Sequence, residues 1–206
     1  LEMTVMLSSA LTITSCSDDD PQATTSSITI EFDNIAGSSN LVLNTEDTPY
    51  TNGHGESYKA TLLMYYVSSI KLKTEDGKIY EDPVSPDGSK GYYLIDESKP
   101  ATQEVTLENV PFGEYSEITF TIGVDANQVS QGAQTGALDP ANGLFWSWNS
   151  GYIFMALEGV SPASTEEEHL FQYHVGGYKE DAASNQYNNV RTVTLGFNGD
   201  TAPVRA

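Results

Sequence analysis

The sequence predicts an all-β fold, an antiparallel β-sandwich with Greek-key-like connections. Segments rich in β-branched and aromatic residues recur along the chain, and several of them alternate apolar and polar side chains with the period of a half-buried strand. Gly, Pro, Asn and Asp gather between these segments, as turns require. No segment shows the periodicity of an amphipathic helix. With 206 residues and 38% hydrophobic content, the chain can bury one sizeable core, and we expect one folded domain.

The expected strands number eight to ten. The clearest alternation lies in residues 28–33, where Ile28, Ile30 and Phe32 share one side of the strand. Residues 58–73 form the longest apolar-rich run, whose tyrosines and valine favour a long strand over a helix. Further strands are expected at residues 41–43, 92–95, 104–107, 118–124, 145–155, 170–176 and 191–197. The connections are turns at residues 36–40, 50–56, 75–78, 110–115 and 158–168, and a long loop at residues 125–143.

The charge of the chain restricts its partners. It carries 29 acidic and 9 basic side chains, a formal net charge of −20. Such a charge repels phosphate backbones and anionic lipid head groups and attracts cations, so nucleic acid is excluded as a partner. Solubility outside the cell is a simpler account of the same charge.

The first residues predict a secreted lipoprotein. A short apolar run at residues 3–13 is too short to span a bilayer and leads into Ile13-Thr14-Ser15-Cys16, which resembles a bacterial lipobox. We therefore expect residues 1–15 to be a signal peptide whose basic beginning is clipped, and Cys16 to carry a lipid. On this interpretation Cys16, the single cysteine, is an anchor and not a metal ligand.

Residues 16–27 are rich in Ser, Thr, Asp and Pro and are expected to form a disordered tether. The acidic run at residues 18–20 is similar to the surface-export signals of Bacteroidetes-type lipoproteins, or it is a solvated linker. We expect an outer-membrane lipoprotein that faces the periplasm or the cell surface and touches the membrane only through its lipid. The sandwich domain is expected at residues 28–206. It is expected to be truncated at its end, because the last strand stops nine residues from the C-terminus and leaves its edge uncovered.

The stretch at residues 145–155 holds both tryptophans and several other aromatic residues. As one strand, it places Trp146, Trp148, Tyr152 and Phe154 on the same side. Packing in the core is the ordinary role of such a strand. The polar residues between the tryptophans favour the alternative that the indoles line a site.

Residues 170–176 hold the histidine of greatest interest. Alternation places Phe171, Tyr173 and Val175 on the core side, and Gln172 and His174 on the other. If this strand pairs with the tryptophan strand, His174 falls opposite a position between Trp148 and Tyr152, within reach of one ion. A hydrogen-bonded structural histidine is the alternative.

The other histidines are weaker candidates for a functional site than His174, and the sequence lacks the known catalytic motifs. His54 lies in a Gly-rich loop and is expected to be exposed. The run at residues 166–169 is not a helical zinc motif. No nucleophile elbow, phosphate loop or dinucleotide fingerprint is present, and we expect no enzymatic activity.

A group of short motifs makes the chain similar to a known family. They are Tyr50-x-Asn52-x-x-Gly55, Leu63-x-Tyr65-Tyr66-Val67-Ser68-Ser69-Ile70-x-Leu72, Val110-Pro111-x-Gly113-x-Tyr115, Ile122-Gly123-Val124-Asp125, residues 145–155 and Phe171-x-Tyr173-His174-x-Gly176. From about Ile28 to the C-terminus, this pattern resembles the MbnP-like copper-binding domain family.

The resemblance implies a secreted β-sandwich that binds copper through a histidine and a tryptophan oxidised to kynurenine. A partner di-haem peroxidase of the MbnH type performs that oxidation in the family. Carried onto this chain, Trp146 or Trp148 is the modified residue and His174 the histidine ligand. Gln172, Met64, Met155 and His54 are the candidate additional ligands.

Two other functions fit the same residues. A cell-surface glycan-binding or adhesion module would use Trp146, Trp148 and Tyr152 as a stacking platform, with residues 125–143 as its rim. A purely structural domain would keep these aromatic residues in its core and bind no ligand.

Overall fold

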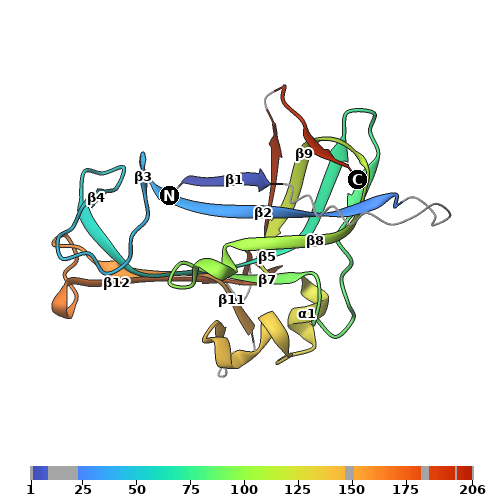
Figure 1. Ribbon diagram of the computed structural model, residues 1–206. Coiled ribbons are helices and arrows are strands. Elements are labelled where there is room, and N and C mark those ends of the chain that lie inside the picture. Colours follow the sequence, from blue (N-terminus) through green and yellow to red (C-terminus); the bar gives the residue numbers. More distant parts are fainter. Residues whose placement is uncertain (1, 9–22, 147–150, 182–185, 198, 206) are drawn as a thin grey trace.

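The computed structural model describes residues 2–8, 23–146, 151–181, 186–197 and 199–205. They form two packed antiparallel sheets and a small two-stranded ribbon (Figure 1). The smaller of the two packed sheets contains β1 (Glu2–Ser8), β2 (Thr25–Ala36), β3 (Ser39–Asn40) and β8 (Glu104–Pro111). The larger sheet contains β4 (Tyr50–Thr51), β5 (Ser57–Thr74), β6 (Ile79–Glu81), β7 (Tyr92–Asp96), β9 (Gly113–Ile122), β10 (Phe145–Trp146), β11 (Gly151–Val160), β12 (Leu170–Gly176), β15 (Arg191–Gly196) and β16 (Ala202–Val204). The ribbon is β13 (Tyr178–Asp181) with β14 (Gln186–Asn188).

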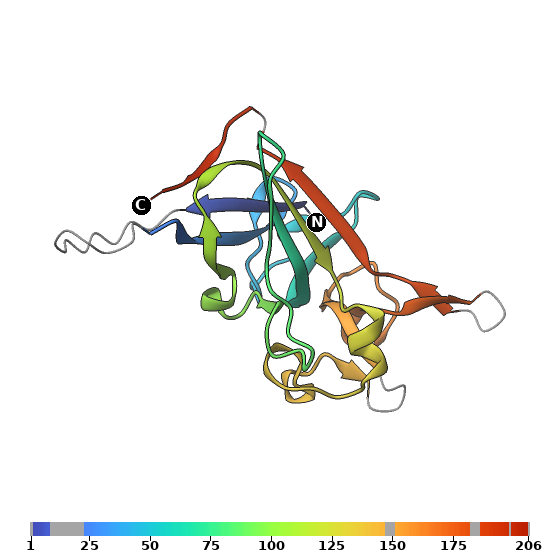
Figure 2. The ribbon, with the colours of Figure 1, turned by 90° about the vertical axis from the view of Figure 1, so that its right-hand side faces the viewer.

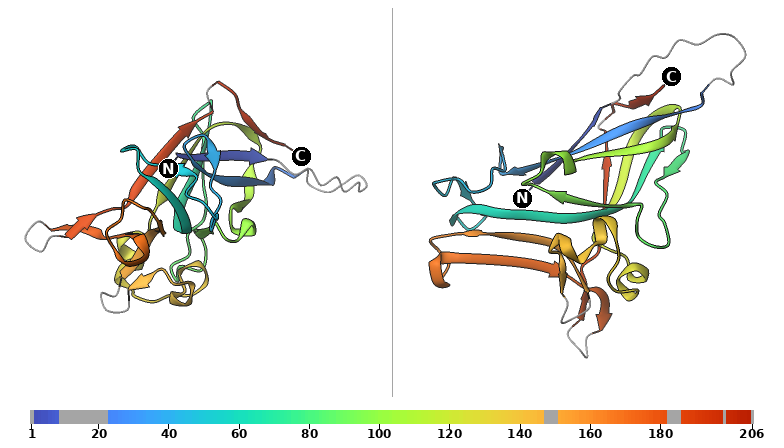
Figure 3. Two further views of the ribbon diagram at one scale, coloured as in Figure 1. Left: turned by 90° about the vertical axis from the view of Figure 1, so that its left-hand side faces the viewer. Right: turned by 60° about the horizontal axis from the view of Figure 1, so that its bottom comes forward.

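The long strand β5 is the central strand of the larger sheet. One edge of its first half pairs with β11, and the same edge of its second half pairs with β9. β4, β7 and β6 pair with the other edge in turn. β12 continues the sheet beyond β11, so the first half of β5 and the β11–β12 hairpin form a wing (Figure 3).

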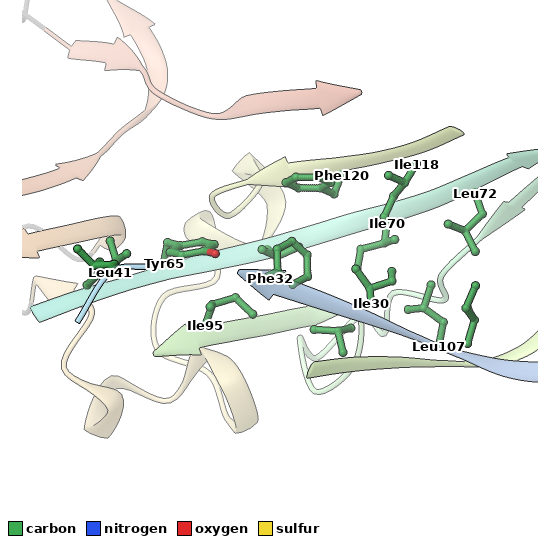
Figure 4. Close-up of a cluster of buried hydrophobic side chains, with 14 of the residues drawn as sticks. Ile30, Phe32, Leu41, Tyr65, Ile70, Leu72, Ile95, Leu107, Ile118 and Phe120 are labelled. Carbon is green, nitrogen blue, oxygen red and sulfur yellow. The ribbon is translucent and has the colours of Figure 1, made fainter. Parts of the chain in front are cut away.

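The main core lies between the two sheets and confirms the predicted sandwich. Ile28, Ile30 and Phe32 are buried along β2, as their alternation predicts. Phe32 meets Phe120 of β9 edge to face, with ring centroids 5.5 Å apart (Figure 4). Burial of this apolar surface is the chief stabilising contribution, because the single cysteine leaves no intramolecular disulfide.

Most predicted strands are present, with two differences near the start of the domain. β2 begins at Thr25, three residues before the expected start at Ile28. Residues 41–43 do not form a strand; the pairing with β2 stops at Asn40, and the Leu41 N–H bonds only the Asn34 carbonyl. Residues 2–8 of the expected signal peptide form β1, which pairs with β2, and residues 25–27 of the expected tether belong to β2. Residues 9–22, with Cys16 among them, lie outside the described part, so cleavage and lipidation stay predictions.

The end of the chain adds a strand that was not expected. β5 pairs with one edge of β9, and β15 and then β16 pair with the other edge. β16 thus extends the pairing along β9, while among the described residues no strand pairs with the outer edge of β15.

The outer side of the larger sheet carries a second apolar cluster, which includes Tyr66, Tyr152 and Phe154. The long connection after β9 covers it (Figure 2). This connection contains three short helices: α1 (Ala126–Ser130), η2 (Gly136–Leu138) and η3 (Pro140–Asn142). Asp125 caps α1 by accepting hydrogen bonds from the Asn127 and Gln128 N–H groups.

The remaining short helices are η1 (Pro100–Thr102) and η4 (Glu167–His169). Among the described residues, no helix has the length and apolar content needed to cross a bilayer.

Candidate functional site

The aromatic stretch at residues 145–155 forms two antiparallel strands, and the prediction of one continuous strand is wrong. Phe145 of β10 lies opposite Tyr152 of β11, and Trp146 lies opposite Gly151. The connecting residues 147–150, with Trp148 among them, lie outside the described residues. The sequence around the reversal contains Asn, Ser and Gly, which favour turns. Their signal was outweighed by the run of aromatic residues on either side.

β12 pairs antiparallel with β11 as expected, but in another register. His174 lies opposite Ala156, and the prediction of a partner between Trp148 and Tyr152 is wrong. β11 continues to Val160, five residues beyond the predicted end of that strand. Because every pair in a hairpin depends on where the turn begins, this extension moves the partner of His174 along the strand.

Trp146 nevertheless lies close to the part of β12 that carries His174. A Cβ atom placed on Gly176 would lie 2.7 Å from Cζ3 of the Trp146 indole, so the ring packs against the Gly176 backbone. Positions 174 and 176 of a strand share one side of the sheet and are about 7 Å apart. The structure therefore brings the Trp146 ring and the His174 side chain to the same side of the β11–β12 hairpin.

The imidazole of His174 is held by the carboxylate of Glu158. Nε2 of His174 lies 2.6 Å from Oε1 of Glu158, and the two side chains are 32% and 27% exposed. An ionised carboxylate only accepts hydrogen bonds, so in the neutral imidazole the proton lies on Nε2. Nδ1 makes no hydrogen bond to another described residue, and its lone pair is available for a ligand.

A model of one protein family matches nearly all of the chain that forms these strands. It is the model described as MbnP, and it covers residues 25–205. The chain belongs to the MbnP family. Among solved structures, MbnP from Methylosinus trichosporium has a similar fold, with a TM-score of 0.55 and 17% identity over 82% of this chain and 71% of that chain. No curated protein matches the sequence.

In this MbnP-family chain, Met64 shares the side of the sheet that carries His174. Ala156 lies opposite Met64 of β5 on one side and opposite His174 of β12 on the other. The three side chains therefore form a row across three neighbouring strands, with a methyl group in the middle. Met64 is only 8% exposed and belongs to the outer apolar cluster. Ala156 is itself only 2% exposed, so neighbouring side chains cover it.

The other candidate ligands are distributed differently. Met155 packs against the main core, on the opposite side of the sheet from His174. Gln172 lies opposite Glu158 and shares the His174 side, where it is exposed. His54 lies in the turn before β5, roughly 20 Å from Met64 along the strand, and the structure does not bring it near His174.

The metal-binding capacity of the described residues is limited. Within them, no three His, Cys, Asp or Glu side chains gather in a group that could hold a metal ion. The donors that do meet are the His174 imidazole and the Glu158 carboxylate. The Met64 thioether lies across the row, and the Trp146 indole, which is not itself a metal donor, lies beside Gly176. Imidazole and thioether are ligands that copper accepts.

Tyr152 lies in the interior and cannot serve as a stacking platform. It is 1% exposed, and its hydroxyl donates to the Leu138 carbonyl and accepts from the Gln134 N–H. Its ring meets Phe145 and Tyr66 edge to face, with centroids 5.0 and 5.9 Å apart. The prediction that Tyr152 forms a glycan-stacking platform together with the tryptophans is therefore wrong. This aromatic layer instead supports Phe145, next to Trp146.

Glu158 is the residue of this face that sequence reasoning missed. The prediction assigned it to the turn at residues 158–168, although it lies within β11. Leu157 and Val160 continue the apolar pattern past Met155, and Pro162 marks a later turn. A predicted strand that ended at Val160 would have included Glu158. Period-2 alternation would then have placed Glu158 on the same side of the sheet as Ala156 and the polar residues of β12.

Proposed function

We propose that this MbnP-family protein is an extracytoplasmic, non-enzymatic copper-binding lipoprotein, and that copper binds on the side of the wing that carries His174. Membership of the family suggests a copper-associated protein. The observation that carries the proposal is the His174–Glu158 pair at 2.6 Å, in a row with Met64 across Ala156. These donors suit copper chemically, and the formal charge of −20 favours the approach of a cation.

Glu158 orients the ligand in this proposal. Histidines that bind metals usually donate their second ring N–H to a carboxylate, which fixes the tautomer and the ring orientation. Here the Glu158 carboxylate accepts from Nε2, which leaves Nδ1 as the donor for the ion. The soft thioether of Met64 would favour copper in its reduced state. Bound copper is the cargo of the protein in this account, and no reaction is assigned to it.

Trp146 is the proposed site of oxidation to kynurenine by a partner di-haem peroxidase. Indole has no lone pair suited to a metal. Oxidative cleavage of the C2–C3 bond of its five-membered ring, with two equivalents of hydrogen peroxide as the oxidant of the peroxidase, followed by hydrolysis of the N-formyl group to formate, leaves an aryl amine that has one. Trp146 packs on Gly176, two residues from His174, through Cζ3 and Cη2 of its ring. The nitrogen that would become the amine is bonded at the opposite end of the ring, so the proposal requires the modified side chain to turn toward the imidazole. Trp148 lies outside the described residues and is the second candidate for the same modification.

Peptide mass spectrometry tests the modification. The protein would be produced with and without a di-haem peroxidase of the MbnH type, and each tryptophan peptide examined. We expect kynurenine at residue 146 only when the peroxidase is present. Kynurenine at residue 148 alone would reassign the site, and unmodified tryptophans in both samples would remove the peroxidase from the account.

Copper titration of the whole chain tests the binding itself. The ion would be added in competition with a chromophoric chelator, first to the unmodified protein and then to protein produced with the peroxidase. We expect one copper per chain in the modified protein and weaker binding in the unmodified one. Failure of both samples to compete with the chelator would overturn the proposed function.

The lipid anchor has its own test. We expect the mature protein to begin at Cys16, to carry a lipid there and to fractionate with the outer membrane. A Cys16→Ala variant should instead be released in soluble form, and a variant that remains in the membrane would contradict this expectation.

A further inference from the structure

The inner side of the wing is not covered by the second sheet. Leu157 of β11 and Phe171 and Tyr173 of β12 lie on the side of the hairpin that faces the main core elsewhere. The prediction that Tyr173 is a core residue is nevertheless wrong, because Tyr173 is 60% exposed. The smaller sheet ends at the turn between β2 and β3, while the β11–β12 hairpin continues alongside the first half of β5 (Figure 3).

A connected series of aromatic rings occupies this inner side. Tyr58 of β5 and Phe171 meet edge to face with centroids 6.1 Å apart, and Phe171 and Tyr173 are tilted at 5.6 Å. Tyr50 continues the series inward, with its ring centroid 5.6 Å from that of Tyr58. Phe171 lies directly over Gly159, where a Cβ atom would come within 2.6 Å of its ring. The series is thus fixed at its buried end and exposed at Tyr173.

Tyr58, Phe171 and Tyr173 of this series line a groove of about 580 Å³. One wall is Gly37 in the turn between β2 and β3, another is the loop with Asn52 and Glu56, and the third is the turn with Ser161 and Ser164. The volume falls in the range of about 300–1,000 Å³ that is typical of small-molecule sites. The groove is built entirely from described residues.

The groove offers hydrogen-bonding groups beside its rings. The Asn52 side-chain amide donates to Oε2 of Glu56 at 2.7 Å, so the amide and the carboxylate are held together at one end. Within the described part of the chain, the hydroxyls of Tyr58 and Tyr173 make no hydrogen bond. Aromatic faces and adjacent polar groups together suit a ligand with one apolar and one hydroxylated surface.

The charge of the groove restricts the class of ligand that it can bind. Glu56 is the one charged residue among those that line it, and the chain as a whole carries −20. Phosphorylated and carboxylated ligands are therefore repelled. A pyranose ring has an apolar C–H surface that stacks on tyrosine and phenylalanine, and hydroxyls that an amide and a carboxylate can bind as a pair.

We propose that this groove binds a neutral oligosaccharide, with a sugar ring stacked on Tyr173 and its hydroxyls bonded to the Asn52–Glu56 pair. The site is separate from the proposed copper site, because neighbouring residues of β11 and β12 point to opposite sides of the hairpin. Its ligand needs neither copper nor a modified tryptophan. The two proposals can therefore fail independently.

Isothermal titration of the copper-free full chain tests the groove. The probes are neutral oligomers of glucose, xylose, mannose and N-acetylglucosamine, with an oligogalacturonate as the anionic comparison. We expect binding of at least one neutral probe and no binding of the anionic one. Lack of binding to every neutral probe would overturn the proposal, as would preference for the oligogalacturonate.

Two tyrosine variants locate the binding. Tyr173→Ala removes the exposed ring and should weaken binding at least about tenfold. Tyr187→Ala is the matched control, since Tyr187 of β14 is also exposed, at 64%, and lies outside the groove. Both variants should melt like the parent chain, because neither ring is buried. Equal binding by the parent and Tyr173→Ala, or loss of binding in Tyr187→Ala alone, would contradict the assignment.

Discussion

Nε2 of His174 lies 2.6 Å from Oε1 of Glu158, across the ladder that joins β12 to β11. Glu158 pairs with Gln172 and His174 pairs with Ala156, so the two side chains are diagonal neighbours on one side of the sheet. The contact fixes the imidazole and leaves Nδ1 available. This relationship makes Glu158 the positioning residue of the proposed copper site.

The first prediction concerns that carboxylate. Glu158→Gln keeps the shape of the side chain but can no longer fix the imidazole tautomer. We expect copper affinity to fall about 10–100-fold. The melting temperature should change little, because the side chain is partly exposed. Chelator competition measures the affinity, with Glu104→Gln on β8 as a control for charge alone. Unchanged affinity in Glu158→Gln would show that the carboxylate does not position the ligand.

The second prediction compares two methionines on opposite sides of the sheet. Met64→Leu removes the thioether from the row with His174, and Met155→Leu removes one from the core side. Both are volume-conserving changes and should cost less than about 1.5 kcal/mol of stability. We expect Met64→Leu alone to weaken the binding of reduced copper, by about tenfold. Equal affinities for the two variants would exclude Met64 as a ligand.

The third prediction concerns the contact between Trp146 and β12. In Gly176→Ala, the new methyl group would lie 2.6 Å from the Tyr152 carbonyl oxygen and 2.7 Å from the Trp146 ring. We expect a loss of about 1–3 kcal/mol in the free energy of unfolding and a change in tryptophan fluorescence. Gly196→Ala is the control, because its nearest neighbour would be the Ser116 carbonyl oxygen at 4.0 Å. If both variants unfold like the parent, the indole does not pack on Gly176.

The fourth prediction concerns stability at high pH. Burial raises the pKa of Tyr65, Tyr66 and Tyr93 above the ordinary value of 10.0, and it raises the pKa of Tyr80 to about 12. Asp82 hydrogen-bonds to the Tyr93 hydroxyl and raises that pKa further. The folded state therefore holds protons that the unfolded chain releases near pH 10. Its stability is fully present below that pH and falls as the pH rises above it.

A pH titration followed by tyrosinate absorbance and far-ultraviolet circular dichroism checks this fourth prediction. We expect ionisation of the buried tyrosines and loss of the sheet signal to coincide above about pH 10. Ionisation of all tyrosines near pH 10 with the sheet intact would be the contrary result.

Much of the fold follows from local patterns in the sequence. The period-2 alternation of Ile28, Ile30 and Phe32 locates β2, and the aromatic-rich run at residues 58–73 locates β5. Residues 170–176 match β12 as predicted. These segments have a strong preference for strand and a consistent buried side, so local and tertiary forces agree.

The candidate site was harder to predict, because it depends on where strands end. A run of aromatic residues concealed the chain reversal between β10 and β11, and an early end assigned to β11 removed Glu158 from the sheet. Both errors change the register, and register decides which side chains meet. The exposure of Tyr173 depends on the extent of the second sheet, which alternation within one strand cannot report.

The comparison of two histidine variants tests the central claim most directly. Copper would be titrated in competition with a chelator into the parent chain, His174→Ala and His54→Ala, all produced with the peroxidase. We predict that His174→Ala loses at least about a hundredfold in affinity, whereas His54→Ala, with its loop position far from β12, binds like the parent. Parent-like copper binding by His174→Ala would contradict the account.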